Sequence, residues 1–117
     1  KQWISLGMDI GAHTSSHADL TAISKLKAKR EISDCKNELE RIYKVEVTDF
    51  CYPFGCFNEI VCSMTKDSGY LSATTMLRGR ANEKSNQYML PRIPINHRTL
   101  PHLFLAKILT KYEDKRK

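Results

Sequence analysis

Two histidines, His13 and His17, are the residues of this sequence best suited to chemistry. Imidazole is the commonest side-chain metal ligand, and a spacer of three residues lets two rings converge on one ion from a tight loop or a helical turn. A catalytic zinc usually takes three protein ligands and a water, so a third group, often a carboxylate, has to come from elsewhere. Taken alone, the pair also fits two histidines at a chance spacing on a solvated turn, so the neighbouring elements have to decide.

The segment before the pair has the pattern of a β-strand. Apolar residues at positions 4, 6, 8 and 10 alternate with more polar ones, which predicts a strand that ends at Gly11. The two histidines would then follow the carboxyl end of a strand, where open α/β sheets and α/β barrels place their ligand-binding loops. Asp9 could accept a hydrogen bond from an imidazole N–H, or it could be a polar residue at a strand end.

The middle of the chain alternates helix and strand patterns. Apolar residues at three-and-four spacing predict a helix from the N-cap Ser24 to about Lys44, and residues 48–52 read as a strand. After the turn Pro53-Phe54-Gly55, we expect Asn58 to cap a second helix over 59–67, and residues 70–76 predict a third strand. This order predicts an α/β fold of parallel strands with helical crossovers.

The last third of the sequence is less regular. Residues 78–87 are polar and predict an exposed loop, and the two prolines within residues 90–95 predict an edge strand or a channel wall. Residues 100–112 predict a final helix, which is followed by a basic tail.

Size and composition indicate one globular domain or a piece of one. The chain has 117 residues, of which 41% are hydrophobic and 27% charged, and this balance excludes collagen-like, low-complexity and disordered classes. The net charge of +6 falls mostly in residues 25–30, 78–84 and 111–117, where helix faces, a loop and a tail explain it, so we predict no nucleic-acid partner. No run is long enough to span a membrane.

The four cysteines do not indicate a structural zinc site. None of them forms a Cys-x-x-Cys pair, which leaves a zinc ribbon or a thioredoxin-type motif without support. Cys51 and Cys56 flank the Pro-Phe-Gly turn, so a disulfide between them is possible.

Three segments together resemble the polysaccharide deacetylases of the NodB-homology, carbohydrate esterase type. Asp9-Ile10-Gly11-Ala12-His13-Thr14-Ser15-Ser16-His17 is similar to the family's His-Ser/Thr-x-x-His metal motif with its acidic-Ile-Gly context. Phe50-Cys51-Tyr52-Pro53-Phe54-Gly55 resembles its Pro-aromatic-Gly motif, and the segment 69–75 resembles its Gly-Tyr strand. The resemblance runs from about Trp3 to Tyr112.

The resemblance implies a partial distorted (β/α) barrel whose N-terminal strands are missing. Residues 1–117 would be the C-terminal portion of a single deacetylase domain. The family's Thr-Phe-Asp-Asp motif supplies a general base and the third metal ligand, and no Asp-Asp pair exists in this sequence. We therefore expect the segment to be inactive and unstable when isolated.

The implied activity is metal-dependent hydrolysis of N-acetyl groups on a polysaccharide or amino sugar, a carbon-nitrogen bond outside peptides. His13 and His17 would bind a divalent metal, with zinc indicated by two imidazoles and an expected carboxylate. Phe54 would offer its backbone N–H to the oxyanion, its ring and Tyr52 would line the substrate groove, and His97 would be the general acid. We also expect the Thr14 hydroxyl to hold the histidine loop.

Each role has an alternative. Tyr52 and Phe54 could pack in the core, and His97 could be a solvated histidine. Cys51 stands where many members have arginine, and Ile95-Asn96-His97 matches the family's Leu-x-His motif only loosely.

The competing functions are a non-catalytic carbohydrate-binding remnant of the same fold and a basic interaction module. The resemblance favours the cell envelope or an extracellular location, and the sequence indicates neither the sugar nor the oligomeric state.

Overall fold

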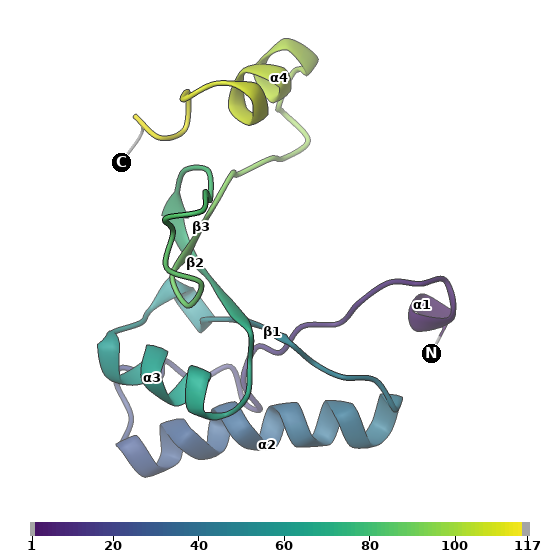
Figure 1. Ribbon diagram of the computed structural model, residues 1–117, viewed down its shortest axis with the longest axis vertical. Helices are drawn as coiled ribbons and strands as arrows, with labels where there is room; N and C mark the ends of the chain where they lie inside the picture. The colour runs from purple at the N-terminus through teal and green to yellow at the C-terminus, as the bar shows by residue number, and fades with distance from the viewer. Residues whose placement is uncertain (1, 116–117) are drawn as a thin grey trace.

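The structure is a computed structural model that describes residues 2–115. Eight elements follow one another along these described residues (Figure 1). In order they are α1 (Gln2–Ser5), α2 (Lys25–Tyr43), β1 (Asp49–Cys51), the 3-10 turn η1 (Pro53–Gly55), α3 (Glu59–Asp67), β2 (Ser72–Arg78), β3 (Leu90–Arg92) and α4 (Pro101–Leu109).

The three strands form one parallel sheet in the order β1-β2-β3. Phe50 pairs with Ala73, and Arg78 pairs with Arg92. The crossover from β1 to β2 runs through α3, which confirms the predicted parallel α/β arrangement, whereas β2 reaches β3 through a loop without a helix. β3 lies at the edge of the sheet, as the prolines of this segment predict.

Both central helices form where the sequence predicts them, because their caps are local. The Ser24 hydroxyl accepts a hydrogen bond from the Lys27 N–H at 3.3 Å, and α2 ends at Lys44 in the left-handed conformation. The Asn58 side chain accepts from the Val61 N–H at 2.9 Å and starts α3.

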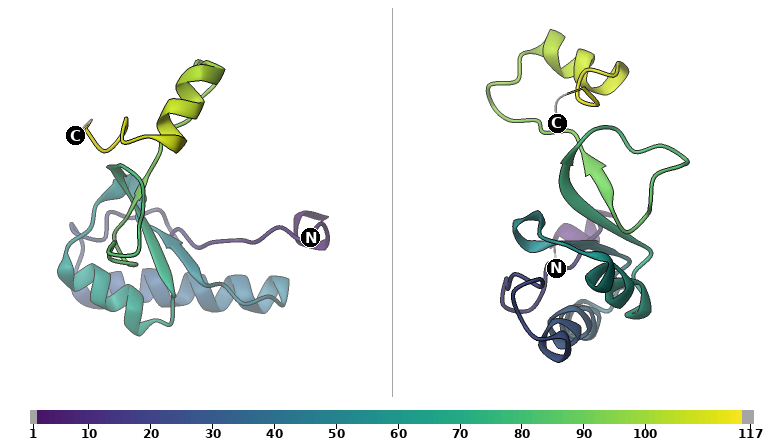
Figure 2. Two further views of the ribbon diagram at one scale, coloured as in Figure 1. Left: turned by 45° about the horizontal axis from the view of Figure 1, so that its top comes forward. Right: turned by 90° about the vertical axis from the view of Figure 1, so that its left-hand side faces the viewer.

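The core lies between the sheet and these two helices, which are on the same side of it (Figures 1 and 2). Phe50, Tyr52 and Ala73 are buried there, and the Tyr70 hydroxyl donates to the carbonyl oxygen of Ile32 in α2 at 3.0 Å. Residues that alternate with the buried ones are more exposed and lie on the other face of the sheet; among them are Cys51, Met76, Arg78 and Arg92.

The predicted strand over residues 4–10 is wrong. The chain forms the short helix α1 and then runs extended to Ala12, which makes a single parallel bridge to Phe50. Leu6 and Met8 are exposed, because within residues 2–115 no strand lies beside this segment to complete a ladder. The segment projects from the body of the molecule and carries α1 at its end (Figure 1).

The final helix is shorter than the predicted 100–112, because α4 ends at Leu109. It stands beyond the carboxyl ends of β2 and β3, away from α2 and α3 (Figure 1). The ammonium of Lys107 in α4 donates to the Pro94 carbonyl oxygen at 2.8 Å and lies 2.5 Å from the buried Glu113 carboxylate. Across the described residues, no helix combines the length and the apolar composition that a membrane crossing requires.

Candidate active site around His13 and His17

The loop of residues 12–17, called the histidine loop below, is fixed to the sheet at its first residue, Ala12. The Ala12 N–H donates to Asp49 O at 2.8 Å, and its carbonyl oxygen accepts from the Cys51 N–H at 2.9 Å. His13 Nδ1 lies 2.7 Å from the Cys51 carbonyl oxygen. Because a carbonyl oxygen can only accept, Nδ1 is the donor of this bond, and in the neutral tautomer Nε2 has the lone pair that can bind a metal.

Three of the predicted site residues lie together. The ring centroids of His13 and His17 are 4.8 Å apart at 66°, and those of His17 and Phe54 are 4.7 Å apart at 76°. All three side chains are exposed, and 61% of the Phe54 surface is accessible to solvent. The Pro-Phe-Gly turn therefore stands directly against the histidine loop.

The backbone at this site is strained. Thr14, His17 and Phe54 have φ angles of 63°, 58° and 58°, a region that residues with a Cβ rarely adopt. Such conformations persist where the surroundings impose them, and they concentrate at functional sites.

Glu31 of α2 anchors the histidine loop by hydrogen bonds to Ser16. Its carboxylate accepts from the backbone N–H of Ser16 at 2.8 Å and from the Ser16 hydroxyl at 2.7 Å. These bonds, led by the one from the hydroxyl, lower the pKa of Glu31 below its ordinary value. The expectation for Thr14 is wrong, because its hydroxyl is buried and has no hydrogen-bond partner in the part of the chain that the structure describes.

Tyr52 does not reach the surface in this structure. Its ring is 1% exposed, and its hydroxyl donates to the Tyr88 carbonyl oxygen at 2.9 Å. Burial raises the pKa of this phenol. Of the two aromatic residues expected to line the groove, the structure places Tyr52 in the core beneath the turn and Phe54 outside.

His97 lies in an exposed turn after β3. Over residues 2–115, no hydrogen bond or ring contact joins it to the histidine pair, and its role stays a prediction. The Asp9 side chain is exposed as well, and its backbone carbonyl oxygen accepts from the indole N–H of Trp3 at 3.2 Å. No third metal-binding side chain joins the pair within the same described range.

The structure adds a residue that the sequence does not single out. Arg92 of β3 places Nη1 3.7 Å from the Cys51 sulfur, so a guanidinium lies beside the residue that holds His13. The two positions are 41 residues apart and meet only through the pairing of strands. No local sequence pattern predicts such a contact. All four cysteines are free thiols, so Cys51 and Cys56 are not bridged.

Known proteins with similar sequences come from one family. The polysaccharide deacetylase family model matches residues 1–73. YxkH of Bacillus subtilis strain 168, whose name assigns it to the polysaccharide deacetylases, is 25% identical over 96 residues, which are 82% of this chain and 34% of YxkH.

Solved structures show the same fold. The deacetylase PplD of Streptococcus pyogenes, solved in complex with acetate, superposes with a TM-score of 0.86 at 24% identity over 91% of this chain and 47% of that protein. BC0361, a polysaccharide deacetylase from Bacillus cereus, gives 0.84 at 29% identity over 92% and 34%.

The chain thus spans between a third and a half of the length of these relatives. More than half of its residues match one family model, and its parallel α/β fold is that of solved deacetylases. This chain belongs to the polysaccharide deacetylase family.

Proposed function

We propose that the protein is a metal-dependent hydrolase that removes N-acetyl groups from a polysaccharide or an amino sugar. In this proposal the chain supplies the C-terminal part of a distorted (β/α) barrel, and other parts of the protein complete it. The observation that carries the proposal is the hydrogen bond between His13 and the Cys51 carbonyl oxygen, because it orients one imidazole of a close pair for metal binding.

The metal would be held by His13 and His17, with a third ligand from a part of the protein outside these residues. Two nitrogen donors and a carboxylate are a set that zinc commonly accepts. A divalent metal bound here would polarise the acetyl carbonyl and make water a stronger nucleophile.

The chain's own residues would orient the acetamide and stabilise charge. In this proposal the backbone N–H of Phe54, whose ring contacts His17, donates to the oxyanion that develops when water adds to the acetamide carbon. The carbon-nitrogen bond then breaks, the amine takes a proton, and acetate and a free amino sugar result. We assign the proton donor to His97, while a base from outside the chain removes the proton of the water.

The histidine pair provides the direct test in the full-length protein. His13→Ala and His17→Ala should each lose bound zinc, measured by plasma mass spectrometry, and should release no free amine from an N-acetylglucosamine oligomer. His102→Ala, an exposed histidine on α4, is the matched control and should keep both. If zinc and activity survive both substitutions, the proposal is wrong.

A second test concerns the segment itself. Residues 1–117 with added zinc should not deacetylate the oligomer, because the base and the third ligand are expected elsewhere. A full-length protein that binds the oligomer without releasing amine would instead be the carbohydrate-binding remnant. Binding to an anionic polymer that does not depend on the histidines would indicate the basic interaction module.

A further inference from the structure

The segment between β3 and α4 leaves the sheet at the edge where the histidine loop lies. β1, β2 and β3 are parallel, so the residues that follow β3 emerge at the same edge as the Pro-Phe-Gly turn, which follows β1. His97, the proton donor of the proposed function, belongs to this segment. The contacts that hold the segment in place therefore bear on the reaction.

His97 lies in a turn that Asn96 closes. The Asn96 side-chain oxygen accepts from the Arg98 N–H at 2.9 Å, and its carbonyl oxygen accepts from the Thr99 N–H at 2.9 Å. The Asn96 N–H donates to the Thr99 hydroxyl at 3.1 Å. Because these bonds close the turn within residues 96–99, it moves as one unit, and its position depends on what holds its ends.

The end of the turn nearer the sheet is held from α4. The Lys107 ammonium donates to the Pro94 carbonyl oxygen at 2.8 Å, shortly before His97 in the chain. Lys107 is 8% exposed, so its charge is largely withdrawn from water and needs a counterion. The buried Glu113 carboxylate supplies it at 2.5 Å and also lies 3.9 Å from the Arg78 guanidinium of β2. Glu113 thus joins α4 to β2 and, through Lys107, holds the start of the segment that carries His97.

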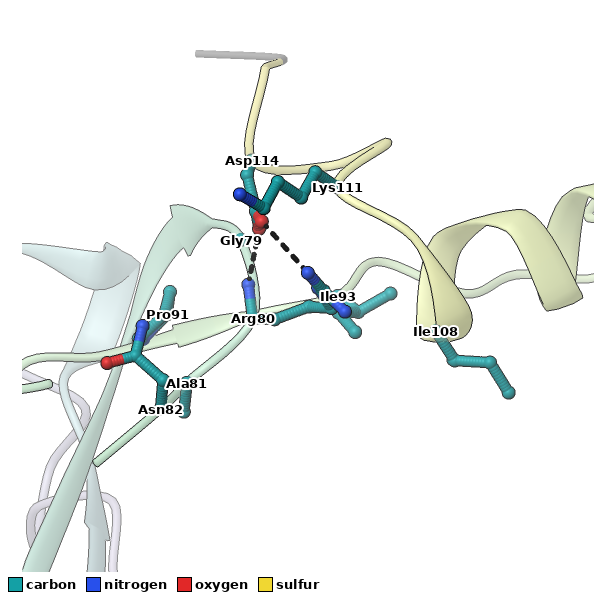
Figure 3. Close-up of a pocket in the computed structure, with 9 residues that line it drawn as sticks. All are labelled: Gly79, Arg80, Ala81, Asn82, Pro91, Ile93, Ile108, Lys111 and Asp114. Atoms are coloured by element: carbon teal, nitrogen blue, oxygen red, sulfur yellow. Dashed lines mark hydrogen bonds and ion pairs between the residues drawn. The ribbon is translucent and has the colours of Figure 1, made fainter. Parts of the chain in front are cut away.

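The next residue, Asp114, has a separate partner. It accepts from the Arg80 backbone N–H at 2.9 Å and from the Arg80 guanidinium at 3.4 Å, at the wall of a cavity of about 770 Å³ (Figure 3). These bonds, led by the one from the backbone, lower the pKa of the Asp114 carboxyl. Asp114 therefore fastens the same C-terminal segment to the β2–β3 loop, at a different place from Glu113.

We propose that Glu113 is a positioning residue for the deacetylation, through its hold on the turn of His97. It keeps the Lys107 ammonium on the Pro94 carbonyl oxygen, and a hydrogen bond from a charged donor is stronger than one between neutral groups. A displacement of about 1 Å in a catalytic group can lower a rate about a hundredfold, so loss of this link should slow proton transfer to the departing amine and leave substrate binding unchanged. This inference rests on the proposed function, because it takes His97 as the proton donor.

Two substrates of the full-length protein separate positioning from support of the fold. An N-acetylglucosamine oligomer needs a proton for its amine to leave, whereas para-nitrophenyl acetate releases a phenolate that is stable without one. Only the part of each rate that His13→Ala abolishes is counted. Glu113→Gln should lower kcat for the oligomer at least about tenfold, with KM and the kcat for the ester each within about twofold of the wild type. With His97→Ala already present, Glu113→Gln should lower the oligomer rate no further.

Asp114→Asn is the matched control, because it removes the neighbouring charge and should leave the ratio of the two rates unchanged. If Glu113→Gln does not fold, because it leaves the Lys107 ammonium buried without its carboxylate, a double variant replaces it. Glu113→Gln combined with Lys107→Met buries neither charge and should show the same selective loss on the oligomer.

Equal losses on both substrates, or no loss on either, overturn the inference, and so does a His97→Ala variant that keeps the oligomer rate. If the wild type releases no amine, the proposed function fails, and hydrogen exchange of residues 94–99, followed by mass spectrometry, decides about the contact alone. Faster exchange there in Glu113→Gln than in Asp114→Asn supports the link from Glu113 to the turn, and equal exchange overturns it.

Discussion

Glu31 accepts both the backbone N–H and the hydroxyl of Ser16, at 2.8 and 2.7 Å, and so fastens the histidine loop to α2. Glu31→Gln keeps the size of the side chain but removes its charge and one of its two acceptors. We expect a loss of about 1–3 kcal/mol in the free energy of unfolding of the full-length protein, measured with urea. Glu38→Gln, an exposed residue of the same helix, should change it by less than about 0.5 kcal/mol.

The same contact predicts a dependence on pH. The pKa of Glu31 in the folded protein lies below its ordinary value of 4.5, so the contribution of this carboxylate is complete above the unfolded pKa and is lost as the pH falls through the folded one. The gap in stability between wild type and Glu31→Gln should therefore be constant near neutral pH and shrink below about pH 4.5. A gap that widens in acid would contradict this assignment.

Gly55 is required both by its positive φ and by its close contact with Met76, and two alanine variants can separate these effects. Its φ is +69°, and an added Cβ would meet the Cβ and Cγ of Met76 at 2.7 Å. Gly55→Ala should cost about 2–4 kcal/mol in the free energy of unfolding, from the backbone strain and the overpacking together. Gly7 has a φ of +79° and nothing within 4 Å, so Gly7→Ala should show the backbone part alone, about 1–2 kcal/mol. Equal losses in the two variants would exclude the clash.

Phe54 combines an exposed ring with a left-handed backbone. Phe54→Gly and Phe54→Ala both remove the ring. Only the glycine variant also relieves the strain of the left-handed backbone, which the alanine variant keeps. The glycine variant should therefore be about 1 kcal/mol more stable than the alanine variant, the reverse of their usual order. Both should raise the KM for an N-acetylglucosamine oligomer, because the ring that contacts His17 is gone. If alanine is the more stable of the two, the turn is not strained at this residue.

Local signals were enough to predict much of the fold. The capping side chains of Ser24 and Asn58 bond three residues ahead, within the reach of a sequence pattern, and both helices begin where predicted. Residues 4–10 show the limit of such patterns, since alternation predicts a strand only if a partner strand lies beside it. The described chain provides a single bridge, at Ala12.

The candidate site likewise contains features that could be predicted from the sequence and features that could not. The spacing of His13 and His17 and the Pro-Phe-Gly turn could be recognised in the sequence, and the structure brings them together. The contacts that support them could not, because Glu31 meets Ser16 across 15 positions and Arg92 meets Cys51 across 41. Such contacts depend on how helix and strands pack, and no periodicity in the sequence records them.

A substitution at Tyr52 tests whether this residue serves in the core or in the substrate groove. Its hydroxyl donates to Tyr88 O from a buried position, so Tyr52→Phe should lower the free energy of unfolding by about 1 kcal/mol. The KM for an N-acetylglucosamine oligomer should stay within about twofold of the wild type, because a residue in the core does not meet the sugar. Phe54→Ala is the counterpart and should raise KM with little loss of packing, since most of its ring is exposed. A raised KM for Tyr52→Phe at unchanged stability would restore Tyr52 to the groove and show that the complete protein opens this side of the turn.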